Sequence, residues 1–288
     1  MTRPLLKIPL LRQLLNARED LRQLRAAAEL QARLNKELLT ANLLSQSKYQ
    51  DPKRLNRHES QVFSQNGEDG VIAEIFARIG VADRIFVELG VGDGLENNTA
   101  YLLFHGWSGF WFEGDEVNVQ AIRKSFAPST GNARLVVAKE WFTAENARDT
   151  LTKHQVPREF DLLSLDVDRN TSWIWRNLGD LRPRVVVIEY NASIPPQDEW
   201  EIPYRADATW EGTLYFGAGL RTLQKIGEEL GYLLVGCELS GTNAFFVRSD
   251  LALGKFAAPF SAENHYEPPR HFLTRTWGHR RSFDDSCP

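Results

Sequence analysis

The sequence has few cysteines and no long apolar run. Its only two cysteines are Cys237 and Cys287, too few for a disulfide framework, and no Cys-x-x-Cys pair is present that could hold zinc. No stretch of eighteen consecutive apolar residues occurs, so we expect no membrane-spanning helix. Arg12, Arg18 and Asp20 interrupt the segment where a secretion signal would need an apolar core. These absences predict a protein of the reducing cytoplasm.

The chain also lacks a large excess of charge of either sign. It has 34 Lys and Arg residues against 38 Asp and Glu residues, a net charge of −4. We therefore expect no nucleic-acid partner. The charge is uneven, however, because residues 1–57 carry 12 basic and only 5 acidic side chains. This asymmetry indicates an appended segment that takes part in interactions.

Residues 4–46 contain no glycine and are rich in good helix formers. Apolar residues recur there at alternating spacings of four and three, as a short heptad seam: Leu10, Leu14, Ala17, Leu21, Leu24 and Ala28. Three interpretations stay open: a helix packed on its own domain, a coiled coil that makes a homo-oligomer, and a basic helix on a membrane surface. We assign residues 1–57 to a helical extension and linker, 58–250 to the main domain, and 251–288 to a tail that packs on it.

Apolar segments and amphipathic helical segments alternate from residue 60 onward. Short apolar runs predict strands at 85–89, 109–112, 135–138, 161–167 and 185–190, followed by a hairpin at 233–237 and 244–247. Helices are expected between them at 64–80, 95–104, 117–126 and 214–230. Such alternation is typical of a mostly parallel sheet with helices on both faces. The fold class is therefore α/β, with a Rossmann-like seven-stranded sheet that ends in an antiparallel hairpin.

The first predicted strand runs into a glycine-rich turn. Glu88 lies near the strand end, and Gly90, Gly92 and Gly94 follow with Asp93 between the last two. Glycines in such a turn let the chain reverse sharply and let a ligand approach the backbone. The second predicted strand ends in two more acids, Glu113 and Asp115, about 23 residues after Gly90. In nucleotide-binding folds an acid at this distance accepts hydrogen bonds from ribose hydroxyls.

Several of these segments resemble the FkbM-type methyltransferase family. The similar segments are 64–70 (SQNGEDG), 86–99, 106–109 (GWSG) and 161–168 (DLLSLDVD), and the likeness spans roughly residues 60–250. It implies S-adenosylmethionine as the cofactor, held by Glu88, Gly90, Gly92, Asp93, Gly94, Glu113 and Asp115. It also implies transfer of a methyl group to a hydroxyl of a sugar, glycan or natural-product acceptor. The chain departs from the family at Gly114, where many relatives have Pro, and at Arg169, where relatives often have Gly.

Acids follow the fourth and fifth predicted strands, which should open on one crevice. Asp166, Asp168, Glu189 and Asn191 could together hold Mg²⁺, as in catechol-type methyltransferases. Alternatively, Asp166 or Asp168 serves without a metal as the catalytic base, or the acids are structural. Asp166-Val167-Asp168 is also an Asp-x-Asp pair, which is typical of metal-dependent glycosyltransferases.

Two further features bear on ligand binding. Trp141 or Phe142, which follow the third strand, should lie beside an adenine ring or belong to the core. Residues 190–216 form a polar stretch with irregular aromatics, including Trp210 and Tyr215, that predicts a lid or an acceptor-binding segment. A catalytically silent scaffold that acts through residues 1–50 remains the non-enzymatic alternative.

Overall fold

The computed structural model describes residues 9–274 of the chain. The chain divides into two compact units, residues 1–46 and 47–288. The first unit contains one helix, α1 (Pro9–Ser45), whose leucines Leu14, Leu21, Leu24 and Leu38 are exposed. A single helix has no apolar surface of its own against which to bury them. None of the helices in residues 9–274 has the length and apolar character needed to cross a membrane.

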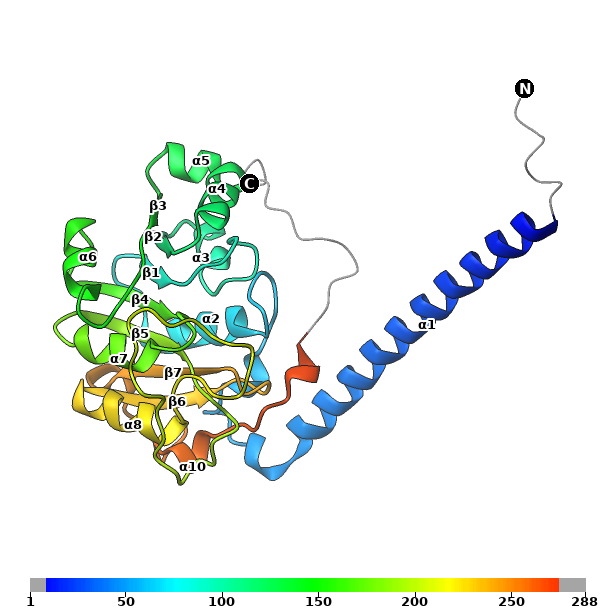
Figure 1. Ribbon diagram of the computed structural model, residues 1–288. Helices are drawn as coiled ribbons and strands as arrows, with labels where there is room; N and C mark the ends of the chain where they lie inside the picture. The colour runs from blue at the N-terminus through cyan, green and yellow to red at the C-terminus, as the bar shows by residue number, and fades with distance from the viewer. Residues whose placement is uncertain (1–8, 275–288) are drawn as a thin grey trace. The chain divides into compact units, whose positions relative to one another are not determined.

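The second unit is built on one seven-stranded sheet (Figure 1). The strands are β1 (Ile85–Leu89), β2 (Ser108–Glu113), β3 (Leu135–Lys139), β4 (Glu159–Leu165), β5 (Arg182–Glu189), β6 (Tyr232–Cys237) and β7 (Asn243–Arg248). Their spatial order is β3-β2-β1-β4-β5-β7-β6. Strands β1 to β5 are parallel, and β7 is antiparallel to both β5 and β6. The predicted fold class, with its terminal hairpin, is confirmed.

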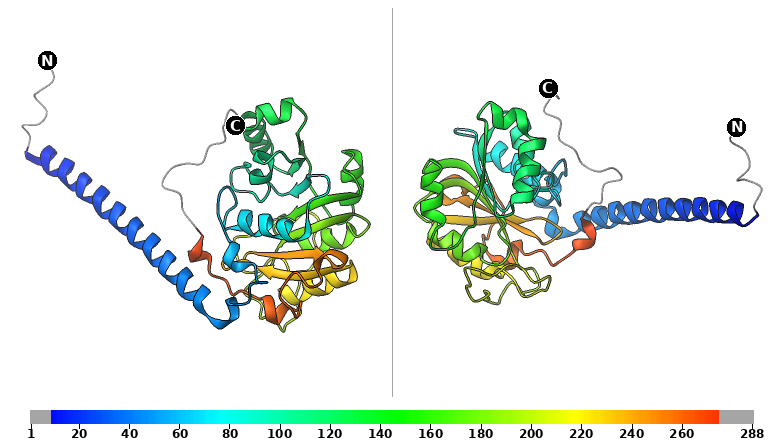
Figure 2. Two further views of the ribbon diagram at one scale, coloured as in Figure 1. Left: turned by 180° about the vertical axis from the view of Figure 1, so that it is seen from behind. Right: turned by 45° about the horizontal axis from the view of Figure 1, so that its top comes forward.

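Helices cover both faces of the sheet (Figure 2). The α-helices are α2 (Glu68–Ile79), α3 (Ala100–Phe104), α4 (Glu116–Ser125), α5 (Ala127–Gly131), α6 (Ala147–Lys153), α7 (Thr171–Asn177), α8 (Leu220–Glu229), α9 (Ser249–Ala252) and α10 (Ala262–His265); the 3₁₀ turns are η2 (Ser47–Tyr49), η3 (Asn56–His58) and η4 (His271–Leu273). Alternate strand residues point to opposite sides. Phe86 and Trp111 therefore join the core beneath α2, α3 and α4, while Val87 and Phe112 join the core beneath α6, α7 and α8.

Three helices begin later than the sequence predicts, and a side chain explains each case. The Asp69 carboxylate accepts the backbone N–H groups of residues 62–64, which holds the segment before α2 as a loop. Glu88 does the same for the residues before α3. Before α8, Asn191 donates to the carbonyls of Leu214 and Phe216, and Gly217 has a φ of +58°. Each of these side-chain contacts is independent of the apolar pattern, so helical periodicity does not reveal it.

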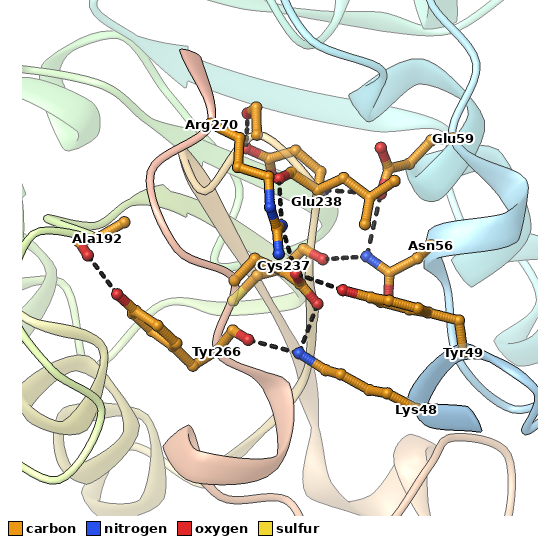
Figure 3. Close-up of polar contacts among 12 residues, drawn as sticks. Lys48, Tyr49, Asn56, Glu59, Ala192, Cys237, Glu238, Tyr266 and Arg270 are labelled. Carbon is orange, nitrogen blue, oxygen red and sulfur yellow. Dashed lines mark hydrogen bonds and ion pairs between the residues drawn. The ribbon is translucent and has the colours of Figure 1, made fainter. Parts of the chain in front are cut away.

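A buried polar cluster joins the two ends of the second unit (Figure 3). Glu267, which is 1% exposed, accepts hydrogen bonds from Lys48, Tyr49 and Arg270 at 2.7, 2.7 and 2.8 Å. The compact unit thus begins at residue 47 rather than at 58, where the sequence analysis starts the main domain. Of the predicted tail, Phe256, Ala262 and Glu267 are buried, and residues 275–288 lie outside the described part of the chain.

Candidate functional site

A cavity of about 470 Å³ lies at the carboxyl ends of the central strands. The chain runs from β1 outward to β3 and then returns to β4 on the other side of β1, so strand order reverses between β1 and β4. Ligands of open α/β sheets bind at this switch point. Predicted site residues that line the cavity are Gly90, Gly92, Glu113, Asp115, Trp141, Asp166 and Asp168. The structure therefore brings together most of the site that the sequence predicts.

The glycine turn after β1 forms one wall of the cavity. Gly90 has a φ of +81°, and a Cβ on it would lie 1.6 Å from the carbonyl oxygen of Asp166. Only glycine fits there, because β4 passes so closely beside β1. Gly92 has a φ of +61° and open space where a Cβ would be. A ligand in the cavity can therefore approach the backbone at Gly92.

Glu113 connects the glycine turn to the end of β2. Its two carboxylate oxygens accept hydrogen bonds from the backbone N–H of Gly92, at 2.8 Å, and of Asp115, at 2.9 Å. Each oxygen retains a further lone pair. The Asp115 side chain accepts from Val117 N at 2.6 Å and caps α4. Glu113 thus holds two loops in place and still offers acceptor capacity to a ligand.

The two aromatic residues after β3 have different surroundings. Phe142 is buried and packs edge-on against Phe112, with ring centroids 5.3 Å apart. Trp141 is 49% exposed on the cavity wall, and its indole N–H donates to the carbonyl of Ala206 at 3.0 Å. A Cβ on Gly114 would lie 3.0 Å from the Trp141 ring. The lack of a side chain at Gly114 thus leaves room for this indole.

Asp166 and Asp168 contribute carboxyl groups to the cavity. Both residues are exposed to the cavity, but the surrounding protein partly desolvates the Asp166 carboxyl and raises its pKa; repulsion from Asp168, Glu88 and Glu68 adds to the effect. Partial desolvation also raises the pKa of Asp168, followed by repulsion from Glu113. Asp168 has a φ of +56°, which is unusual for a residue other than glycine. Two carboxyl groups with raised pKa in a cleft are typical of acid–base chemistry.

Three residues predicted to hold the cofactor do not line the cavity. Glu88 is buried, and its carboxylate accepts from Asn97 Nδ2, Asn98 N, Thr99 Oγ1 and Ser164 Oγ. Asp93 is exposed and accepts from Leu95 N within its own turn. Gly94 is buried, and a Cβ there would lie 3.0 Å from the Phe126 ring and 3.1 Å from Trp111. In the structure these residues contact the turn itself or the core next to it, and none of them lines the cavity.

The predicted Mg²⁺ ligands are not gathered around one point. Among residues 9–274, no group of three or more His, Cys, Asp or Glu side chains lies close enough to hold a metal ion. Glu189 and Asn191 are not among the residues that line the cavity. The Asn191 amide oxygen accepts from both the N–H and the hydroxyl of Ser193. The donor set does not fit Mg²⁺, and we derive no step through a metal.

The β5–α8 loop (residues 190–219) extends over the cavity, and Ala208 and Thr209 from it line the wall. Four hydrogen bonds hold this loop in place. Asn170 donates to Arg205 O at 2.7 Å, and Trp141 donates to Ala206 O. The Tyr204 hydroxyl accepts from Ala144 N and donates to the Glu145 carboxylate. Farther along, Trp210 and Tyr215 are about half exposed. The predicted lid segment is thus an ordered cover that leaves aromatic surface available beside the cavity.

Three polar residues of the cavity wall were not predicted from the sequence: Asn118, Glu140 and Asn170. Asn118 lies three residues after Asp115, one turn along α4, and this spacing could have identified it. The only available signal for Asn170 was its position two residues beyond Asp168. Single asparagines are common in loops and at helix starts, so neither position is distinctive without the fold.

Comparisons with known proteins found no matching protein-family model and no matching curated protein. Solved structures with a similar backbone fold include an S-adenosylmethionine-dependent methyltransferase from Clostridium acetobutylicum ATCC 824. Its sequence identity is 12%, the match covers 61% of this chain and 88% of that one, and the TM-score is 0.41. Another is TehB from Haemophilus influenzae, with 13% identity over 62% of each chain and a TM-score of 0.39. A third is an O-methyltransferase family protein from Burkholderia thailandensis, with 9% identity over 63% and 57% and a TM-score of 0.39. The proposals below rest on the residues of this chain rather than on these likenesses.

Proposed function

We propose that this protein is an S-adenosylmethionine-dependent O-methyltransferase. The observation that carries the proposal is the cavity at the strand switch point, where Gly92 and Glu113 are joined by a 2.8 Å hydrogen bond. A nucleoside needs close approach to backbone on one side and a carboxylate for its ribose hydroxyls on the other. This pair supplies both. The FkbM-like segments at 64–70 and 161–168 support the same assignment.

The residues around the cavity fit this cofactor. Gly90 and Gly92 would lie along its backbone-facing side, Glu113 would accept from the ribose, and the exposed Trp141 ring would pack against the adenine. When bound, the cofactor supplies a methyl group activated by a sulfonium. The carboxylates of Glu113, Asp115 and Asp166 favour a cationic ligand in this cavity.

The protein must also orient an acceptor hydroxyl and remove its proton. Alignment alone can contribute roughly 7–11 kcal/mol to lowering a barrier. Asp166 and Asp168 lie where the acceptor would meet the cofactor, and the raised pKa of each carboxyl brings it closer to neutral pH, where a general base is most effective. We assign proton removal to this pair. The exposed rings of Trp210 and Tyr215 beside the cavity suit the C–H faces of a sugar, glycan or natural-product acceptor.

Two assignments concern the protein outside the site. We propose that the exposed leucines of α1 associate with a second copy, because a heptad seam of this kind is buried when two helices pair. We also propose a cytoplasmic location, in keeping with the free, buried Cys237.

Calorimetric titration of S-adenosylhomocysteine into protein freed of co-purified nucleoside tests the central proposal. We expect micromolar affinity for the wild type. Glu113→Gln should bind about tenfold more weakly or worse, because a hydrogen bond to a charged group contributes roughly 1.5–3 kcal/mol. Glu116→Gln is the matched control, since this nearby acid is not among the residues that line the cavity.

Three results would oppose the assignment. Equal affinity in Glu113→Gln and wild type would remove the ribose role. If the wild type shows no heat with S-adenosylhomocysteine but is stabilised by a nucleotide-sugar with Mn²⁺, the glycosyltransferase alternative replaces the proposal. If it binds neither, the scaffold alternative gains, and deletion of residues 1–46 should then abolish the cellular role without unfolding residues 47–288.

A further inference from the structure

Arg169 is a buried cation that lacks a partner. Its side chain is 6% exposed, and its Nε is buried with no hydrogen bond. Within residues 9–274, its guanidinium makes no hydrogen bond and no ion pair. The one contact of note is with Tyr215, whose ring centre lies 5.8 Å from the Arg169 Cζ. A cation–π contact offsets only part of the cost of removing a charge from water.

The other buried arginine of the second unit and most of the half-buried ones have partners. Arg54 donates to Asn264, Arg176 pairs with Glu201 at 2.7 Å, and Arg270 pairs with Glu267 at 2.8 Å. Arg134 and Arg184 also have an Nε without a hydrogen bond, but each donates through another nitrogen of the guanidinium. Half-buried Arg182 makes no side-chain hydrogen bond or ion pair with residues 9–274 either, but Arg169 is almost fully buried. A buried charge is normally retained only when it is compensated, and no carboxylate of residues 9–274 forms an ion pair with Arg169.

The position of Arg169 indicates which ligand would compensate it. Its neighbours in the chain, Asp168 and Asn170, both line the cavity, whereas Arg169 and Tyr215 do not. The backbone of Arg169 therefore lies at the cavity wall, and its guanidinium lies over the ring of Tyr215 from the β5–α8 loop. The residues that we assign to the cofactor follow β1, β2 and β3, so Arg169, which follows β4, lies on the acceptor side.

Two more buried polar atoms without hydrogen-bond partners occur just after Arg169, one in residue 170 and one in the first turn of α7. They are Asn170 Oδ1, an acceptor, and Ser172 Oγ, which can donate or accept. A cation, a hydroxyl and an amide oxygen that all lack partners are suited to a ligand that carries an anion together with hydroxyl groups.

We propose that Arg169 binds a carboxylate or phosphate group on the acceptor, so that the substrates are acidic sugars or similar hydroxylated anions. A guanidinium binds either oxyanion through two parallel hydrogen bonds. Anchoring the anion at Arg169 would hold a hydroxyl of the same molecule near Asp168, the residue directly before it in the chain. The description of the ligand as an acceptor rests on the proposed function; the anion site itself does not.

Binding of three sugars to the full chain, with S-adenosylhomocysteine present, tests this proposal. Glucose 6-phosphate and glucuronate separate the phosphate from the carboxylate, and glucose is the neutral reference. We expect one anionic sugar to bind the wild type at least about tenfold more tightly than glucose. Arg169→Gln should abolish that preference, and Arg169→Lys should retain part of it. Arg158→Gln is the matched control. Arg158 is an exposed arginine just before β4, at the end of this strand away from the cavity, so the substitution should not alter the preference for the anionic sugar.

The outcomes separate this proposal from the methyltransferase assignment. If no anionic sugar is preferred, or if Arg169→Gln keeps the preference, the anion site is refuted. If Arg169→Gln instead weakens S-adenosylhomocysteine about tenfold, the guanidinium serves the cofactor and the acceptor assignment is refuted. If S-adenosylhomocysteine does not bind the wild type but the Arg169-dependent preference is present, the anion site stands and methyl transfer fails. Should Arg169→Gln not fold, Arg169→Lys and the wild-type preference still decide.

Discussion

Glu88 provides the sharpest test of how the glycine turn is held. Its carboxylate is 2% exposed and accepts four hydrogen bonds, from Asn97 Nδ2 at 2.7 Å, Asn98 N at 2.9 Å, Thr99 Oγ1 at 2.5 Å and Ser164 Oγ at 3.1 Å. Leucine in its place accepts none. The two hydroxyls can rotate toward other acceptors, but the backbone N–H of Asn98 cannot, and the Asn97 amide presents an unpaired N–H or oxygen to leucine in either orientation.

The expected cost of Glu88→Leu follows from these two N–H groups. Each buried donor that loses its acceptor costs about 1–3 kcal/mol, so the variant should lose roughly 2–6 kcal/mol of unfolding free energy. Glu88→Gln keeps one oxygen. Rotation of Asn97, whose Oδ1 is buried without a partner, can satisfy the new amide, so we expect a loss of about 1–2 kcal/mol.

Urea denaturation followed by tryptophan fluorescence measures both variants. Glu159→Gln, which alters an exposed acid at the start of β4, should stay within about 0.5 kcal/mol of the wild type. The reasoning is refuted if Glu88→Leu loses less than Glu88→Gln, or if it loses no more than the Glu159 control.

Three further predictions follow from other features of the second unit and from α1. Gly90→Ala should unfold the protein or abolish S-adenosylhomocysteine binding, because its Cβ would lie 1.6 Å from a backbone oxygen; Gly92→Ala has open space and should cost only about 1–2 kcal/mol from its φ, as denaturation of both will show. Desolvation, with repulsion from Glu68, raises the pKa of the buried Glu238 to about 8. The folded state therefore holds a proton that the unfolded state releases above pH 4.5, and stability falls by up to about 1.4 kcal/mol per pH unit as pH rises toward 8. Glu238→Gln lacks this loss, so its unfolding free energy relative to the wild type should rise between pH 5 and 8, and a constant difference would contradict the assignment. Deletion of residues 1–46 should convert a dimer into a monomer in sedimentation, without changing S-adenosylhomocysteine affinity, whereas an unchanged number of copies per particle would exclude pairing through α1.

The sequence predicts the sheet well because its strands are short apolar runs bounded by glycines and charges. β1 is predicted to the residue, and the site residues at the ends of β1, β2 and β4 follow from the rule that ligands bind at the carboxyl edge. Motif position alone does not separate a residue that faces the ligand from one that supports the turn. Glu88 and Glu113 point to the same side of the sheet, because Glu88 pairs with Trp111, two residues before Glu113. Glu88 lies inside its strand and is buried, whereas Glu113 is the last residue of β2 and lines the cavity.

Helix starts and the acceptor side were less predictable because distant residues determine them. Residues 214–219 have helical periodicity, yet Asn191 draws two of their carbonyls away and Gly217 turns the chain. Arg169 has an ordinary place in the sequence, after a pair of aspartates. Only its burial, and the absence of an ion pair or side-chain hydrogen bond to it within residues 9–274, make it informative.

The contacts of Glu267 bear on how the protein is synthesised. Lys48 and Tyr49, at the beginning of the second unit, bond to a carboxylate more than 200 positions later. A nascent chain therefore cannot complete this unit until the ribosome has released residue 270. Until then β6 and β7 lack their final cover, and a chaperone that protects exposed strands would have its greatest effect on chains arrested shortly before that point.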